Sequence, residues 1–172
     1  ALGAAAVRAA ADPRVTQVRI CTPDKDLAQC VSGTRIVQED RLRRTIRDEA
    51  GVIAKFGVPP ASIPDYLALV GDSSDGYPGL AGWGAKSASA VLAKYGHLEM
   101  IPKDWRTWQV NAARAGALSM TLEKDRELVL RFPDLATIRT NIPVFETIDE
   151  LEWHGPTPAF DAFKARFDPS TR

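Results

Sequence analysis

The sequence of 172 residues lacks an excess of charge of either sign. Its 22 basic side chains are balanced by 22 acidic ones, so the formal net charge at pH 7 is zero. Proteins that bind nucleic acids over a broad surface usually carry a positive excess. If this chain binds a nucleic acid, we therefore expect local geometry and backbone amides to provide most of the contacts.

The sequence also lacks long apolar runs and has only two cysteines. No run approaches the ~18 apolar residues that a membrane-spanning helix needs, and the alanine-rich start has no charged segment typical of a secretory signal. Cys21 and Cys30 have the spacing of neither a zinc site nor a disulfide framework, so we predict reduced, packed thiols in a cytoplasmic protein. Because the first residue is Ala rather than Met, we interpret the chain as processed, trimmed or partial.

The first 45 residues have the pattern of an α/β domain. We predict a helix over residues 2–11, ended by Asp12-Pro13, because proline disfavours helical geometry in the residue before it. Residues 15–22 and 35–38 are predicted strands, and a helix begins near Asp24 between them. This alternation is typical of a parallel sheet, and a hydrophobic content of 45% is enough for one sizeable core.

The remainder of the chain has a predominantly helical pattern. Ser62 is a suitable N-cap for a helix that Gly71 ends, and Gly96 ends another. We predict helices within residues 40–56 and over 62–70, 85–95, 105–117 and 118–131, then a strand over 136–145 and a loose tail.

Two pairs of aspartates are candidates for metal chemistry. Asp24 and Asp26 directly follow a predicted strand, where the ligand sites of parallel sheets gather, and carboxylates are the ligands that Mg²⁺ prefers. Asp72 and Asp75 are three residues apart, so a helical turn would place them on one face. Two such pairs suit a phosphodiester hydrolase with two cations roughly 4 Å apart. The residue types are equally typical of a solvated helix start at Asp24 and of an Asx turn at Asp72.

A glycine-rich stretch between two predicted helices is the strongest single feature. Residues 78–88 read PGLAGWGAKSA, in which glycines allow positive φ angles and close approach of the backbone to a phosphate. The amides at the next helix start would bind the anion, and Lys86 would add a positive charge. The spacing of a P-loop is absent. The alternative interpretation is a helix–turn–helix corner with glycines present only for packing.

These segments together resemble the 5′-nuclease superfamily, specifically the bacterial 5′→3′ exonuclease domain at the front of DNA polymerase I and its stand-alone relatives. The resemblance is carried, in order, by CTPDKDLAQCV, GVPPASIPDYLALVGDSSDGYPGLAGWGAKSASAVLAKYGHLE and LATIRTNIPV. It implies an α/β fold: the C-terminal part of a PIN-like parallel-sheet nuclease core plus an α-helical helix–hairpin–helix region. We expect the partial core in residues 1–45, the hairpin region in 46–100, and C-terminal helices with a returning strand in 101–172.

The resemblance also implies a role for individual residues. As metal ligands and catalytic residues it implies Asp24, Asp26, Asp72 and Asp75, holding two Mg²⁺ or Mn²⁺ ions. As DNA-binding residues it implies Gly79, Gly82, Gly84, Lys86 and Ser87, with a K⁺ ion at the hairpin. Gly76 stands where the family usually has Asn, and Tyr77 and Trp83 stand where smaller aliphatic residues are usual, so we expect a repacked hairpin.

The function implied is metal-dependent 5′–3′ exonuclease or flap endonuclease activity on duplex or flap DNA in the bacterial cytoplasm, at the nucleoid. The family's other metal carboxylates lie upstream, so we expect this chain to be the C-terminal part and to need the missing N-terminal half for activity. The incomplete carboxylate set and the neutral charge favour one alternative, a non-catalytic helix–hairpin–helix module that binds DNA. A small single-strand RNase of the same class would lack the glycine-rich hairpin.

Overall fold

The computed structural model describes residues 1–166, and its sheet is mixed rather than purely parallel. The strands are β1 (Val18–Cys21), β2 (Ile36–Asp40) and β3 (Thr45–Arg47), in the order β1-β2-β3. β1 and β2 are parallel, with Ile20 beside Gln38, whereas β2 and β3 are antiparallel, with Gln38 beside Arg47. The expected parallel pair is present, but the prediction of an entirely parallel sheet is wrong.

A tight turn explains why residues 40–48 do not form the predicted helix. The Asp40 carboxylate accepts hydrogen bonds from the backbone N–H of Arg43 at 3.0 Å and from its guanidinium at 2.9 Å. Arg44 has a left-handed backbone with φ of 53°. This local turn competes with helix formation, so the chain reverses into β3 and α2 begins only at Glu49, capped by Asp48.

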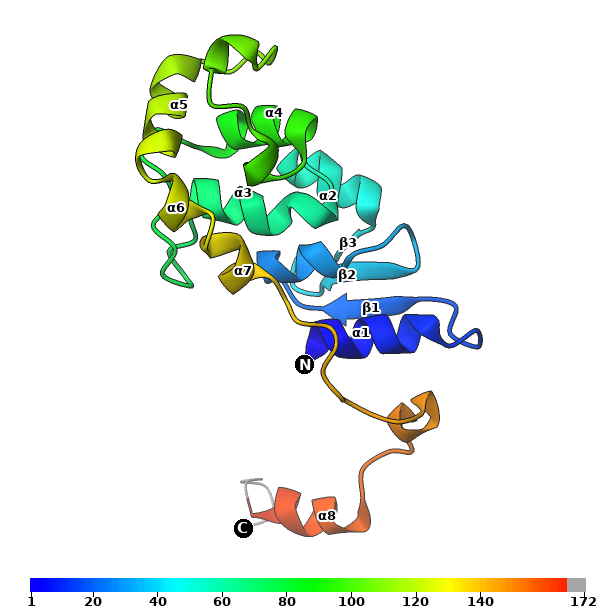
Figure 1. Cartoon of the computed structure of the whole chain (residues 1–172). Helices are drawn as coiled ribbons and strands as arrows, with labels where there is room; N and C mark the ends of the chain where they lie inside the picture. Colours follow the sequence, from blue (N-terminus) through cyan, green and yellow to red (C-terminus); the bar gives the residue numbers. More distant parts are fainter. Residues whose placement is uncertain (167–172) are drawn as a thin grey trace.

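The sheet lies between α1 and a group of helices, as Figure 1 shows. A small apolar cluster joins α1 (Leu2–Ala11) to the sheet, and a larger one lies among the helices around α3. The other α-helices are α2 (Glu49–Phe56), α3 (Ile63–Val70), α4 (Ala85–Tyr95), α5 (Ala115–Lys124), α6 (Arg126–Val129), α7 (Phe132–Ala136) and α8 (Pro158–Ala165). The 3-10 helices are η1 (Lys25–Cys30), η2 (Pro60–Ser62), η3 (Leu98–Met100), η4 (Trp105–Thr107) and η5 (Ile148–Leu151).

Two elements predicted within residues 105–145 do not form as expected. The helix expected over 105–117 is irregular between η4 and the start of α5 at Ala115, because Gln109 and Arg114 adopt positive φ angles and the indole of the buried Trp108 donates to the Pro102 carbonyl at 2.7 Å. No strand forms over 136–145 either. The Gln29 side chain instead pairs with the Ala136 carbonyl and the Ile138 N–H, at 2.9 and 2.8 Å.

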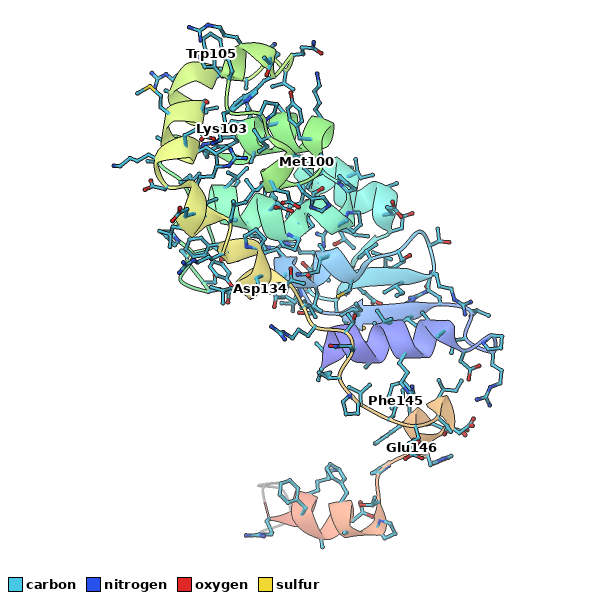
Figure 2. All side chains as sticks on the ribbon, viewed as in Figure 1. Met100, Lys103, Trp105, Asp134, Phe145 and Glu146 are labelled. Carbon is cyan, nitrogen blue, oxygen red and sulfur yellow. The ribbon has the colours of Figure 1, made fainter. Side chains whose placement is uncertain are left out.

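The segment after α7 runs back along α1 and is held there by arginine contacts. Arg8 lies over the Phe145 ring, 5.6 Å from its centre, and donates to the Glu146 carbonyl. Figure 2 labels Phe145 and Glu146 on this segment.

Both cysteines are free thiols; Cys30 is buried, but the prediction of a packed side chain is wrong for Cys21, which is exposed at the end of β1. In residues 1–166, no helix has the length and apolar character to cross a membrane.

Candidate metal centre and DNA-binding hairpin

The first aspartate pair lies just beyond the carboxyl end of β1, as the sequence predicts. Asp24 is the N-cap of η1, and its Oδ1 accepts a hydrogen bond from the backbone N–H of Asp26 at 3.0 Å. The Asp26 carboxylate is half-buried, and its buried Oδ1 has no hydrogen-bond donor among the described residues. Asp24 therefore serves the local turn, whereas Asp26 presents an unsatisfied oxygen.

The second pair lies in a closed loop after α3. Asp72 and Tyr77 exchange two backbone hydrogen bonds of 2.8 Å, which hold residues 73–76 as a small hairpin. Gly71 and Gly79 pack backbone against backbone, so a Cβ on Gly79 would lie 2.7 Å from the Val70 carbonyl carbon. The loop buries Asp72, at 2% exposure, and leaves Asp75 exposed.

The fold brings three of the four predicted aspartates together. Carboxylate oxygens of Asp26, Asp72 and Asp75 all lie within 4.8 Å of one another. Asp24 is not in this group, but it lines the same open cleft of about 380 Å³ together with Asp72 and Asp75. Lys25, between the first two aspartates in sequence, forms an ion pair of 2.7 Å with Asp72 Oδ2.

Concentrated negative charge changes the acidity of these groups. Burial and the neighbouring charges of Asp24, Asp75 and Asp72 raise the pKa of Asp26 to about 6. Burial and the charges of Asp72 and Asp24 also raise the pKa of Asp75. Burial alone would raise the pKa of Asp72, but hydrogen bonds from Lys25 and Ser74 outweigh it, so that pKa is lowered.

The cluster fits a hard divalent cation. Like charges this close are unfavourable unless a cation lies among them, and a buried carboxylate oxygen without a donor is a ready ligand for such an ion. The residues that would hold it are Asp26, Asp72 and Asp75, with Asp24 at the rim of the cleft.

The raised pKa of Asp26 predicts a pH dependence for metal binding. Between pH 3.8 and about 6 the folded chain keeps a proton that the unfolded chain releases, so Asp26 contributes stability at low pH that is lost as the pH rises through about 6. Because a bound cation must displace that proton, we expect Mn²⁺ affinity to fall about tenfold per pH unit below pH 6 and to level off above pH 7. Calorimetric titration from pH 5 to pH 8 checks this. An affinity that is flat across that range would contradict it.

The glycine-rich stretch forms a hairpin between α3 and α4, as predicted. Gly79 and Gly82 have positive φ angles of 67° and 83°, whereas Gly84 is extended and precedes the first residue of α4. Gly82 and Lys86 are exposed, so the tip of the hairpin and the start of α4 face solvent. The Ser87 hydroxyl accepts a hydrogen bond from the Gly84 N–H and donates one to the Gly84 carbonyl, both at 3.0 Å, and so caps the helix.

Trp83 supports this hairpin from beneath. Its indole is buried, donates to the Leu118 carbonyl at 3.2 Å, and lies 6.0 Å from the Trp108 ring. A large aromatic side chain therefore ties the turn to α5 and to the irregular segment before it.

Sequence reasoning missed one side chain that lines the cleft and one that lies near the aspartates. Lys55 of α2 lines the cleft, and nothing in the spacing of α2 relates this lysine to Asp24. Tyr77 lies near enough that burial and the charges of Asp26 and Asp75 raise the pKa of its phenol. Its ring packs edge-on against Phe132 of α7, with centroids 5.9 Å apart.

Comparisons with known proteins assign the chain to one family. The family model described as 5′-3′ exonuclease, C-terminal SAM fold, matches residues 58–159. The chain is 44% identical over 119 residues to a 5′-3′ exonuclease of Aquifex aeolicus, covering 69% of this chain and 40% of that protein. It is 36% identical over 151 residues to DNA polymerase I of Pseudomonas aeruginosa, covering 83% of this chain and 15% of that protein.

A solved structure shows the same fold at low sequence identity. T5 5′-exonuclease with bound divalent metal ions (zinc) aligns with a TM-score of 0.62 at 17% identity, covering 78% of this chain and 48% of that one. This chain thus spans less than half the length of each of these relatives.

Proposed function

Because this chain belongs to the family of 5′-3′ exonucleases with a C-terminal SAM fold, we propose that it is part of a nuclease that hydrolyses DNA phosphodiester bonds at 5′ ends or flaps. One observation carries the proposal: carboxylate oxygens of Asp26 and of Asp72 and Asp75, which are distant from it in sequence, lie within 4.8 Å of one another beside a cleft that Asp72 and Asp75 line. An exposed hairpin that can bind phosphates follows the same loop. The proposed substrate is duplex or flap DNA.

Each group has a distinct task in this proposal. Asp26, Asp72 and Asp75 would hold Mg²⁺ or Mn²⁺, and Asp24 would complete a second position at the rim with carboxylates from an upstream half. Bound divalent cations would supply the positive charge that offsets the charge developing on the reacting phosphate. Lys25 neutralises Asp72 and keeps the loop folded when no cation is present. The hairpin glycines and Lys86 would grip the duplex backbone, with K⁺ as a candidate ion there.

Reconstitution of the enzyme tests the activity. Purified chain should cleave a 5′-flap substrate in the presence of Mg²⁺ only when mixed with, or joined to, the upstream half of the nuclease, because the resemblance to the 5′-nuclease superfamily implies further metal carboxylates in that half. No Mg²⁺-dependent cleavage in the mixture would refute the proposed nuclease activity.

We further propose the three-part division at residues 45 and 100, and a place at the bacterial nucleoid in the cytoplasm.

A second candidate is a helix–hairpin–helix module that binds DNA without cutting it. The Lys25–Asp72 ion pair favours it, since an internal cation already neutralises one carboxylate of the cluster. Mn²⁺ titration separates the two functions. A nuclease half-site should bind Mn²⁺ in a manner that Asp26→Asn abolishes, whereas a pure binding module should show no such site.

The hairpin predicts a selective loss of DNA binding on removing Lys86. Lys86→Ala should weaken duplex binding by roughly tenfold and lower the salt slope by about one, as expected for one lost phosphate contact, while metal binding stays unchanged. Fluorescence anisotropy at several salt concentrations measures both. Lys94→Ala is a matched control, because Lys94 is exposed near the other end of α4 and its ammonium bonds Gln109. Equal losses in the two variants would contradict a specific role for Lys86.

A further inference from the structure

The acidic cleft also has a positively charged wall, on which Lys55 lies. Lys55 lines the cleft together with Asp24, Asp72 and Asp75. Its ammonium lies 4.7 Å from the centre of the Phe56 ring and, within residues 1–166, forms no ion pair with a carboxylate. A lysine beside three aspartates is therefore not used to neutralise them, whereas Lys25 is.

Arg47 stands beside Lys55 on the same side of the sheet. Arg47 of β3 pairs with Gln38 of β2, so the two side chains point to one face, and the Gln38 amide donates to the Asp24 carbonyl. Gly51 of α2 faces Arg47, since its Cβ position would lie 3.3 Å from the Arg47 Cβ. Lys55 follows Gly51 by one helical turn and shares its face of α2.

Neither cation is satisfied by the protein. The Nη1 nitrogen of Arg47 is buried and has no hydrogen-bond acceptor among the described residues. Burial, then the charges of Arg47 and Arg43, lower the pKa of Lys55, with Asp40 opposing and Lys25 adding to the shift. Arg43 itself is paired with Asp40. Lys55 is exposed to solvent, whereas Arg47 Nη1 is not, and an anion bound between the two would relieve their mutual repulsion.

We propose that Lys55, on the wall of the metal cleft, and the neighbouring Arg47 form a binding site for one phosphate of the DNA backbone. The inference rests on the proposed nuclease function and adds a contact that is separate from the hairpin. The acidic residues of the cleft repel the DNA backbone. The two basic side chains at its edge offset that repulsion for one phosphate, which would lie next to the phosphate engaged by the carboxylate cluster and its metal ions. Arg47 supplies a planar set of donors and Lys55 a point charge.

Neutral-backbone DNA tests this contact directly. The measurement uses the nuclease assembled with its upstream half, with Ca²⁺ in place of Mg²⁺. Lys55→Met keeps the aliphatic stem against Phe56 and removes only the charge. We expect roughly tenfold weaker flap binding and a salt slope lower by about one. A neutral methylphosphonate is then placed in turn at each phosphate near the cleavage point. At one position it should weaken binding by the wild type but cause no further loss of affinity in Lys55→Met, because that variant already lacks the contact.

Matched variants complete the design. Lys124→Met removes an exposed lysine of α5 and should bind every substrate as the wild type does, whereas Lys55→Arg should keep the wild-type pattern. If Lys55→Met binds as the wild type does, or if its loss simply adds to that of every methylphosphonate, the phosphate site is wrong while the nuclease proposal stands. If the wild type itself shows no salt-dependent DNA binding, both fall.

Discussion

Replacing Asp26 by asparagine is expected to lower Mg²⁺-dependent flap cleavage by more than about 100-fold in the assembled nuclease. The amide has the shape of the carboxylate but is neutral, so it is a poor ligand for a hard cation. Asp26 also holds the one buried carboxylate oxygen of the cluster that lacks both a hydrogen bond and an ion pair among the described residues. No other residue of this cluster offers the same combination of burial and free coordination.

The same substitution should leave the metal-free fold intact. Since burial and then neighbouring like charges raise the pKa of Asp26 to about 6, a neutral side chain removes both the burial penalty and the repulsion at pH 7. We therefore expect the thermal midpoint without metal to stay the same or to rise. The increase in midpoint that Mn²⁺ causes should disappear, because a ligand stabilises only the state that binds it.

Two outcomes would contradict this role of Asp26. One is cleavage within about threefold of the wild-type rate, a difference well below one kcal/mol in the barrier. The other is an unchanged Mn²⁺-induced shift of the thermal midpoint. Asp161→Asn is the matched control, because Asp161 is an exposed aspartate of α8 that contributes no oxygen to the cluster. It should match the wild type in both measurements.

Local signals in the sequence predicted the elements that carry the site. The Asp12-Pro13 step ended α1, the glycines at 71 and 96 ended α3 and α4, and the glycine-rich stretch became the hairpin between them. These features depend on backbone preferences of neighbouring residues, which the sequence displays directly. The convergence of Asp26 with Asp72 and Asp75 followed from the resemblance to a family rather than from any local pattern.

The features that the sequence did not reveal depend on which partner a side chain contacts. Lys25 turns toward Asp72, which no spacing within CTPDKDLAQCV indicates. The Asp40–Arg43 turn overrode a helical pattern, and the Gln29 side chain took the backbone groups that a returning strand would have used. In each case a side-chain hydrogen bond decided the backbone path.

The largest change in stability is expected from removing the indole of Trp83, which packs against the buried side of the hairpin. Trp83→Ala should lower the free energy of unfolding by roughly 3–5 kcal/mol, because it leaves a cavity against Trp108 and deletes the bond to the Leu118 carbonyl. Trp83→Phe should cost only about 1–2 kcal/mol, since the Thr121 hydroxyl also donates to that carbonyl, at 3.0 Å. Urea unfolding followed by circular dichroism measures both.

The position of Trp83 links this stability to DNA binding. Trp153→Ala is the control for loss of a tryptophan, because Trp153 is 80% exposed and its removal should change stability by less than about 0.5 kcal/mol. At temperatures where Trp83→Ala is still folded, it should bind duplex DNA more weakly than Trp83→Phe, since the exposed turn at Gly82 then has no fixed support. If Trp83→Ala is as stable as Trp153→Ala, the hairpin is held by its glycines and by α4 alone, and the aromatic residue merely fills space there.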